Sequence, residues 1–273
     1  MMRVAVFGAA GRMGATVCRA LDAEADLELV AAVDPGAAGS DLGSVVSGLG
    51  EVAGRVRIRG GVEELDPAGI DVAVDFTAAD AARRNLSWCA ENGVHAVCGT
   101  TGLEAADVAR LSSEFGPPSA ANAVLAANFS LGAVLMMRCA EICAPFFSGI
   151  EVVELHHELK RDAPSGTAIA TSERMERARD ERGSGALAPD PTEREVLEGA
   201  RGAARLSGIH LHSIRLPGLV AHQEVLFGGP GETLTLRHDS TDRTSFMPGV
   251  LLAVRRVGDL DGLVAGIEPL LGL

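Results

Sequence analysis

Residues 154–168 (ELHHELKRDAPSGTA) combine side chains that can exchange protons with a segment that can bind an anion. His156 and Lys160 are four residues apart, and this spacing places both on one face of either a strand or a helix. His157 points away from that face in a regular strand, but it turns inward if the strand ends at this point. The pattern predicts a site that handles protons.

A predicted helix start follows these basic side chains. Pro164 interrupts regular structure, and Ser165 is a favoured N-cap residue. Gly166 and Thr167 then occupy the first helical positions, where backbone N–H groups lack partners and attract a carboxylate. Lys160 or a neighbouring histidine can add balancing positive charge. The stretch therefore predicts a site for a small acidic substrate next to a proton donor.

A metal site and purely structural histidines are the alternative interpretations. Adjacent histidines seldom bind one ion together, the sequence contains no CxxC or HExxH motif, and lysine is a poor ligand at neutral pH. We therefore expect no metal. A helix start with a cation upstream, in a chain that also carries a dinucleotide motif, favours a functional site over structural histidines.

The dinucleotide motif lies at the N-terminus. In VAVFGAAGRMG, Gly8, Gly11 and Gly14 follow an apolar run directly and open a helix-like segment. Glycine permits the tight strand-to-helix turn and lets the backbone approach a pyrophosphate, which the helix N-terminus stabilises. Asp34 ends the second apolar run, twenty residues after Gly14, where a carboxylate suits the hydroxyl groups of the adenosine ribose.

The same positions bear on the choice of nicotinamide cofactor. Asp34 is followed by Pro35 and Gly36, with no arginine beside it to meet a 2′-phosphate, which favours NADH. Arg12, inside the glycine loop, is a cation that could accept a phosphate group, so use of both NADH and NADPH stays open.

The first part of the chain alternates short β-branched runs with helix-like segments, which predicts βαβ units around a parallel sheet. The loops DFT (75–77), GTTG (99–102) and AANF (126–129) lie at the C-terminal ends of three of these runs, at the sheet edge where ligands bind in open α/β folds. We expect the three loops to meet at one crevice. The predicted strands span residues 4–8, 27–34, 71–77, 94–102 and 123–130.

From about residue 128 the pattern changes. Residues 131–147 are apolar nearly all round, which predicts a buried helix. Residues 183–205 are rich in glycine, which predicts a long irregular connection. Consecutive strand-like runs without helices between them predict an antiparallel or mixed sheet. The predicted strands of this part are 150–157, 209–216, 222–228 and 232–238, and the predicted helices are 167–182 and 247–258.

Composition limits the classes of function. The 273 residues carry 37 acidic and 24 basic side chains, an excess that disfavours binding to nucleic acid or to an anionic membrane. No stretch approaches the roughly 20 apolar residues of a membrane span, and the N-terminus lacks a signal-peptide pattern. Five cysteines without a CxxC pair are expected to be small buried side chains in a reducing compartment. We predict a cytoplasmic protein.

Taken together, these motifs resemble the 4-hydroxy-tetrahydrodipicolinate reductase (dihydrodipicolinate reductase) family of the lysine and diaminopimelate pathway. The segment ELHHELKRDAPSGTA matches the signature E-x-H-H-x-x-K-x-D-x-P-S-G-T of that family. VFGAAGRMG, DFT, CGTTG, AANFSLGAV, the segment 218–249 and the ending EPLL extend the resemblance over essentially the whole chain.

The resemblance implies a Rossmann-like domain over residues 1–127, completed by about 240–273, and a central α+β domain over 128–239 that holds substrate and builds a homotetramer. It implies NAD(P)H-dependent reduction of a cyclic dicarboxylate, with loss of water from the 4-hydroxy substrate. By position, His156 would be a proton donor and acceptor, Lys160 a second proton donor and substrate ligand, and His157, Gly166 and Thr167 substrate ligands. The implied cofactor contacts are Gly8, Ala9, Ala10, Gly11, Arg12, Met13, Asp34, Phe76, Thr77, Gly99, Thr100, Thr101, Ala126, Ala127, Asn128, Phe129, Arg243 and Phe246.

Two other classes of protein are compatible with a dinucleotide motif. A regulatory protein that senses the cofactor would have no need for His156, Lys160, Gly166 and Thr167. A different reductase, such as an amino-acid or semialdehyde dehydrogenase, would act on another substrate. Which of His156 and Lys160 donates the proton is left open by the sequence.

Overall fold

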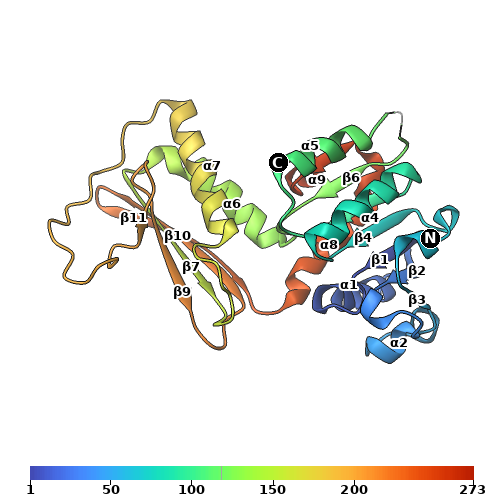
Figure 1. Cartoon of the computed structure of the whole chain (residues 1–273). Coiled ribbons are helices and arrows are strands. Elements are labelled where there is room, and N and C mark those ends of the chain that lie inside the picture. The colour runs from blue at the N-terminus through green and yellow to red at the C-terminus, as the bar shows by residue number, and fades with distance from the viewer. Residues whose placement is uncertain (118) are drawn as a thin grey trace. The chain divides into compact units, whose positions relative to one another are not determined.

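The computed structural model describes residues 1–117 and 119–273 of the chain (Figure 1). The chain forms two compact units. Unit 1 comprises Met1–Ser130 and Phe246–Leu273, and unit 2 comprises Leu131–Ser245. That one unit binds a cofactor and the other a substrate is a prediction about function.

Unit 1 contains a seven-stranded sheet in which every pair of neighbouring strands is parallel, in the order β12-β6-β5-β4-β1-β2-β3. The β-branched runs of the sequence form its central strands, because strands buried on both faces must be apolar throughout. The predicted Rossmann-like parallel sheet is thereby confirmed. The strands are β1 (Met2–Phe7), β2 (Leu27–Val33), β3 (Ile58–Arg59), β4 (Val72–Asp75), β5 (His95–Cys98), β6 (Ala123–Leu125) and β12 (Leu263–Ala265).

Helices cover both faces of this sheet. Leu86 of α4 and Leu111 of α5 pack with Phe7 and the other inward side chains of one face. Helices α1 and α8 contact each other, contribute no residue to that cluster and cover the opposite face. The helices of unit 1 are α1 (Arg12–Asp22), α2 (Leu42–Val45), α3 (Glu51–Gly54), α4 (Ala79–Glu91), α5 (Ala105–Glu114), α8 (Met247–Arg256) and α9 (Glu268–Leu271).

Unit 2 is built on a five-stranded mixed sheet in the order β11-β10-β7-β9-β8. Strand β7 is parallel to β9 and antiparallel to β10, which is in turn antiparallel to β11. Helices α6 (Leu131–Cys143) and α7 (Gly166–Arg182) lie together on one face of the sheet (Figure 1). The predicted mixed sheet is confirmed. Its strands are β7 (Gly149–His156), β8 (Ala203–Ala204), β9 (His210–Arg215), β10 (Ala221–Gly229) and β11 (Glu232–Ser240).

Two expectations about these elements were wrong or incomplete. The apolar helix predicted over 131–147 ends at Cys143, and its side chains Leu135 and Ile142 are exposed in a single chain, because the sheet covers only one face of the helix. Residues 35–70 and 260–273, for which no element was predicted, contain short helices and the edge strands β3 and β12. These elements are too short to carry a periodic pattern.

The cysteine prediction holds for three of the five side chains. Cys18, Cys89 and Cys98 are buried, whereas Cys143 is half-buried and Cys139 is exposed; none of the five forms a disulfide. Burial raises the pKa of the Cys18 thiol to about 12. Over the described ranges, no helix is long and apolar enough to cross a membrane.

Candidate active site

The end of β7 carries a buried carboxylate and a histidine on one face of the sheet. Glu154 and His156 are two residues apart on the strand, so their side chains point the same way. The Nδ1 atom of His156 lies 2.5 Å from Oε2 of Glu154, and the side chain of Glu154 is fully buried. An ionised carboxylate can only accept hydrogen bonds, so Nδ1–H of His156 donates and Nε2 is left for other partners.

Arg215, at the end of β9, holds this carboxylate in its charged form. Its two terminal nitrogens donate to Oε2 and Oε1 of Glu154, each at 2.8 Å, and the backbone N–H of Ser165 donates to Oε1 at 3.1 Å. Burial alone would raise the pKa of Glu154, but hydrogen bonds from His156, Arg215 and Ser213 lower it to about 2. Glu154 is therefore a permanent anion at neutral pH.

The predicted shared face of His156 and Lys160 was wrong. Strand β7 ends at His156, and the following residues form a turn in which the N–H of Lys160 donates to the carbonyl of His157. The Nζ atom of Lys160 instead donates to both carboxylate oxygens of Asp162, at 2.9 and 2.8 Å. Arg215 also donates to the backbone carbonyl of Asp162, at 2.7 Å. His156 and Lys160, the two predicted proton donors, are thus linked through Glu154, Arg215 and Asp162.

The predicted helix start is confirmed. Ser165 is the N-cap of α7, and its side chain accepts a hydrogen bond from the N–H of Ala168 at 3.2 Å. Gly166 and Thr167 are the first two helical residues, so their N–H groups have no partner within the helix. Gly166 is exposed, and nothing lies within 4 Å of the place that a Cβ atom on it would take, so this end of the helix is open to solvent. His157, next to His156, is half-buried.

In unit 1 the glycine motif forms a tight turn between β1 and α1. Gly8 has a φ of 77°, in the left-handed region that favours glycine, and its N–H donates to the carbonyl of Val33. A Cβ atom on Gly14 would lie 2.0 Å from the carbonyl oxygen of Gly8, so only glycine lets α1 pack this closely on the turn. The Asp34 carboxylate accepts a hydrogen bond from the N–H of Ala10 at 3.0 Å, which ties the ends of β1 and β2 together.

A second buried carboxylate joins the loops after β4 and β5. Asp75 is 1% exposed, and its Oδ1 accepts from the hydroxyl groups of Thr77 and Thr100, both at 2.7 Å. The N–H of Thr77 also donates to Thr100, and Asn85 of α4 donates to Oδ2 of Asp75 at 2.7 Å. The DFT and GTTG loops, which were expected to meet, are therefore held together by a side chain.

The third loop joins them through aromatic contacts. The rings of Phe76 and Phe129 lie 5.9 Å apart, and a Cβ atom on Gly99 would overlap the Phe76 ring. The N–H of Ala126 donates to the carbonyl of Cys98, and Oδ1 of Asn128 accepts from the N–H of Ser130. The other predicted contacts lie at the rims of these loops, where Arg12, Thr101 and Ala127 are exposed and Met13 is half-buried.

Two predicted residues lie elsewhere along the chain. Arg243 begins a short 3-10 helix that ends at Phe246, and the chain passes from unit 2 to unit 1 at that point. Both side chains are half-buried.

No individual role was predicted for four polar residues of these sites, namely Asp75, Asn85, Glu154 and Arg215, although Asp75 lies in the predicted DFT loop and Glu154 begins the predicted segment 154–168. Glu154 could have been found, because it lies two residues before His156 on a predicted strand. Arg215 lies 61 residues from Glu154 along the chain, and no spacing in the sequence indicates that contact.

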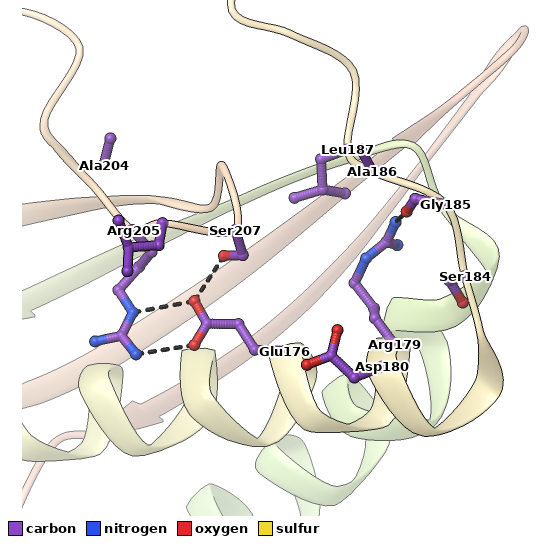
Figure 2. Close-up of a pocket in the computed structure, with 11 residues that line it drawn as sticks. Glu176, Arg179, Asp180, Ser184, Gly185, Ala186, Leu187, Ala204, Arg205 and Ser207 are labelled. Carbon is purple, nitrogen blue, oxygen red and sulfur yellow. Dashed lines mark hydrogen bonds and ion pairs between the residues drawn. The ribbon is translucent and has the colours of Figure 1, made fainter.

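A large cavity elsewhere in unit 2 contains none of the predicted site residues. It has a volume of about 730 Å³ and lies between the C-terminal half of α7 and two further segments, 184–187 and 204–207 (Figure 2). Two of its charges are paired: Arg205 donates to both carboxylate oxygens of Glu176, and Ser207 donates to one of them. Arg179 donates to three backbone carbonyl groups. Within residues 1–117 and 119–273, no three His, Cys, Asp or Glu side chains gather as a metal site requires.

The parallel sheet and the glycine turn before α1 define a Rossmann-type nucleotide-binding protein, whose second unit carries a buried carboxylate–histidine pair and an open helix start. Residues 2–129 match the family described as dihydrodipicolinate reductase, N-terminus, and residues 132–271 match dihydrodipicolinate reductase, C-terminus. The chain belongs to the dihydrodipicolinate reductase family of oxidoreductases, as its resemblance implied.

Individual relatives agree with this assignment. The 4-hydroxy-tetrahydrodipicolinate reductase of Cutibacterium acnes is 49% identical over 273 residues, which cover 100% of both chains. The enzyme of the same name from Nocardia farcinica is 47% identical over 272 residues, covering 100% of this chain and 99% of the relative. A dipicolinate-bound dihydrodipicolinate reductase from Paenisporosarcina sp. TG-14 has a TM-score of 0.83 and 38% identity, covering 98% of this chain and 99% of that chain.

Proposed function

We propose that this protein reduces 4-hydroxy-tetrahydrodipicolinate to tetrahydrodipicolinate, with a nicotinamide dinucleotide as reductant and with loss of water. The observation that carries the proposal is the set of His156, Lys160 and the open start of α7 in a chain that also has a Rossmann-type glycine turn. The full-length relatives carry the name of this activity.

The glycine turn fits a dinucleotide cofactor. Gly11, the N-cap of α1, and Gly8 and Gly14 on either side of it carry no side chains, which would let a pyrophosphate approach the backbone N–H groups at the start of α1. Asp34 would accept hydrogen bonds from the ribose hydroxyls, and the loops around Thr77, Thr100 and Phe129 would border the nicotinamide half. When bound, the cofactor supplies a hydride to an electron-poor carbon of the substrate.

The residues of unit 2 would bind the substrate and move its protons. The N–H groups of Gly166 and Thr167, with His157, would hold the ring carboxylates. Departure of the 4-hydroxyl group as water needs a proton on the leaving oxygen, and this is balanced by the proton that the neighbouring ring carbon gives up in the same elimination. The ring atom that gains electron density after hydride addition needs one proton from outside. His156 and Lys160 are the candidates for these two transfers, and positioned proton transfer contributes about 10²- to 10⁴-fold in rate.

The composition of the chain supports a chemical role for Lys160. It is the only lysine in the sequence, against 23 arginines. Every other permanent cation is thus a guanidinium, which cannot release its proton at physiological pH, whereas an ammonium can. A position that needed only positive charge could be filled by arginine, as all the others are.

The experiment is a coupled assay in which the aldol product of pyruvate and aspartate semialdehyde is supplied and NADH oxidation is followed. Turnover supports the proposed reaction and counts against a cofactor sensor. An enzyme active only on an amino acid or a semialdehyde is instead a different reductase. Running the assay with both cofactors tests the preference: Asp34 without a neighbouring arginine favours NADH, and a preference for NADPH above about tenfold (~1.4 kcal/mol) would contradict it.

Variants of the proton donors make the test specific. His156→Gln and Lys160→Ala should each lower kcat by about 10²-fold or more, while the affinity for NADH stays nearly unchanged. Lys160→Arg keeps the charge and removes the transferable proton, so it should be as slow as Lys160→Ala but retain a lower KM. Thr167→Val should chiefly raise KM. Full turnover in both His156→Gln and Lys160→Ala would refute the assignment of these residues.

We also propose that unit 1 is the cofactor domain, that unit 2 is the substrate and tetramerisation domain, and that the protein works in the cytoplasm. Free thiols at all five cysteines suit a reducing compartment. Most of the exposed large apolar side chains among the described residues belong to unit 2, which favours this unit as the one that associates.

A further inference from the structure

One guanidinium in unit 2 contacts both segments that carry the candidate proton donors. Arg215 makes two hydrogen bonds to Glu154, which holds the ring of His156, and one to the carbonyl of Asp162, whose carboxylate holds Lys160. Its side chain is 20% exposed and that of Glu154 is fully buried. Charged hydrogen bonds between buried groups in fixed geometry are among the stronger polar contacts in proteins.

We propose that Glu154 and Arg215 form a positioning pair, which fixes the orientation and tautomer of His156 and anchors the turn that carries Lys160. This inference rests on the proposed function, because it assigns roles within the same site. Glu154 acts through His156, and Arg215 acts through Glu154 and through the backbone of Asp162. Both are positioning residues and need no contact with the substrate.

The tautomer of His156 follows from the hydrogen bonds that the carboxylate of Glu154 accepts. Glu154 accepts from Arg215, Ser165 and Ser213, and its charge leaves it with no proton to donate to His156. The proton on Nδ1 is therefore fixed, and Nε2 is the ring atom that can exchange a proton with a substrate. A carboxylate on the far side of the ring also stabilises the imidazolium form while the ring holds a second proton.

The chain contains a matched control on the opposite face of the same strand. Glu151 lies three residues before Glu154 on β7, accepts from Arg201 at 2.6 Å and lies 2.6 Å from Nε2 of His212. This second carboxylate–histidine–arginine group has the same chemistry but no link to His156. Replacing Glu151 removes the same charge from the same strand, at a side chain that is 35% exposed, and leaves the contacts of Glu154 in place.

The experiment combines nuclear magnetic resonance with kinetics on the full chain. The imidazole ¹⁵N signals report which ring nitrogen carries the proton, and the signals missing in His156→Gln identify His156. We expect the Nδ1–H tautomer in the wild-type protein and its loss in Glu154→Gln. In the same variant kcat should fall about 10- to 100-fold, while the affinity for NADH stays unchanged. This is the loss typically seen when a hydrogen-bond partner that orients a metal-binding histidine is replaced. Glu151→Gln should keep both the tautomer and kcat.

Arg215→Lys is the second variant, which covers the case in which Glu154→Gln fails to fold. Lysine keeps the charge but cannot reach Glu154 and the carbonyl of Asp162 together, so kcat should fall while the His156 tautomer is partly retained. An Nε2–H tautomer in the wild type, or wild-type kcat in a folded Glu154→Gln, would overturn the positioning role. If the wild type showed no reductase activity but the tautomer still depended on Glu154, the proposed function would fail while the pair itself would stand.

Discussion

Buried carboxylates organise the candidate sites of both units. Asp75 ties together two loops of unit 1 through threonine hydroxyl groups, and Glu154 gathers a histidine, an arginine and a helix start in unit 2. A buried charge is costly unless donors surround it, and each of these carboxylates has at least four hydrogen bonds. Removing one donor should therefore disturb the whole group.

Because of Glu154, we expect the free energy of unfolding to fall as the pH is lowered from about 5 towards 2. Its pKa is about 2 in the folded protein, against an ordinary value near 4.5. A lowered pKa stabilises the fold above pH 4.5, and this contribution is lost as the pH falls towards 2. It amounts to about 3 kcal/mol at neutral pH, of which about 2 kcal/mol is lost between pH 5 and pH 3.

Urea denaturation followed by circular dichroism at pH 5 and pH 3 measures this loss. Glu154→Gln should lose about 2 kcal/mol less than the wild type between these pH values, because it has no carboxylate to protonate. Equal losses in the two proteins would show that Glu154 does not titrate in this window. Asp190, whose pKa is also lowered to about 2, is the same in both proteins and does not affect the difference.

The two helix starts are built in different ways. Helix α1 begins after a glycine turn, with Gly11 as an N-cap that has no side chain, whereas the Ser165 side chain caps α7. The first arrangement lets a large group approach the backbone, and the second fixes one N–H group and leaves two open. Each start suits the ligand proposed for it.

Gly14→Ala should be strongly destabilising. Alanine gains about 1 kcal/mol of helix propensity over glycine, but its Cβ atom would lie 2.0 Å from the carbonyl oxygen of Gly8. The turn must shift to relieve this contact, so we expect a net loss of about 2 kcal/mol or more and a loss of NADH binding. Fluorescence of Trp88, the only tryptophan, reports the unfolding of unit 1, because its ring packs on Phe7 of β1.

Substitutions at two other glycines serve as controls for this prediction. A Cβ atom on Gly11 would lie 3.1 Å from the same oxygen, so Gly11→Ala should have a smaller effect. Gly69 has nothing within 4 Å, and Gly69→Ala should leave both stability and binding unchanged. Equal effects at the three positions would contradict the role of close packing.

The sequence predicted the elements with a strong periodic pattern. The glycine turn, the central parallel strands and the start of α7 follow from local chemistry, and the structure has them. The shared face of His156 and Lys160 failed because it assumed one regular element, whereas β7 ends at His156. The contacts of Asp75 with Asn85 and of Glu154 with Arg215 depend on tertiary packing, which one sequence does not show.

At the scale of the whole molecule, we expect four chains to associate through unit 2. Leu226 of β10 and Ile214 of β9 are exposed on the sheet of unit 2, and a tetramer would cover such side chains. Sedimentation equilibrium should give four times the mass of the chain. Leu226→Glu should give smaller species, whereas Val52→Glu, at an exposed position of α3 in unit 1, should not. A wild-type mass of one chain would contradict this expectation.

The discontinuity of unit 1 has a consequence for biosynthesis. Strand β12 pairs with β6, and α8 packs on α1, yet residues 246–273 leave the ribosome after the whole of unit 2. The continuous unit 2 can close its sheet while the edge of the nascent sheet of unit 1 still lacks its seventh strand. During translation, the part of the protein that begins first is thus the part that is finished last.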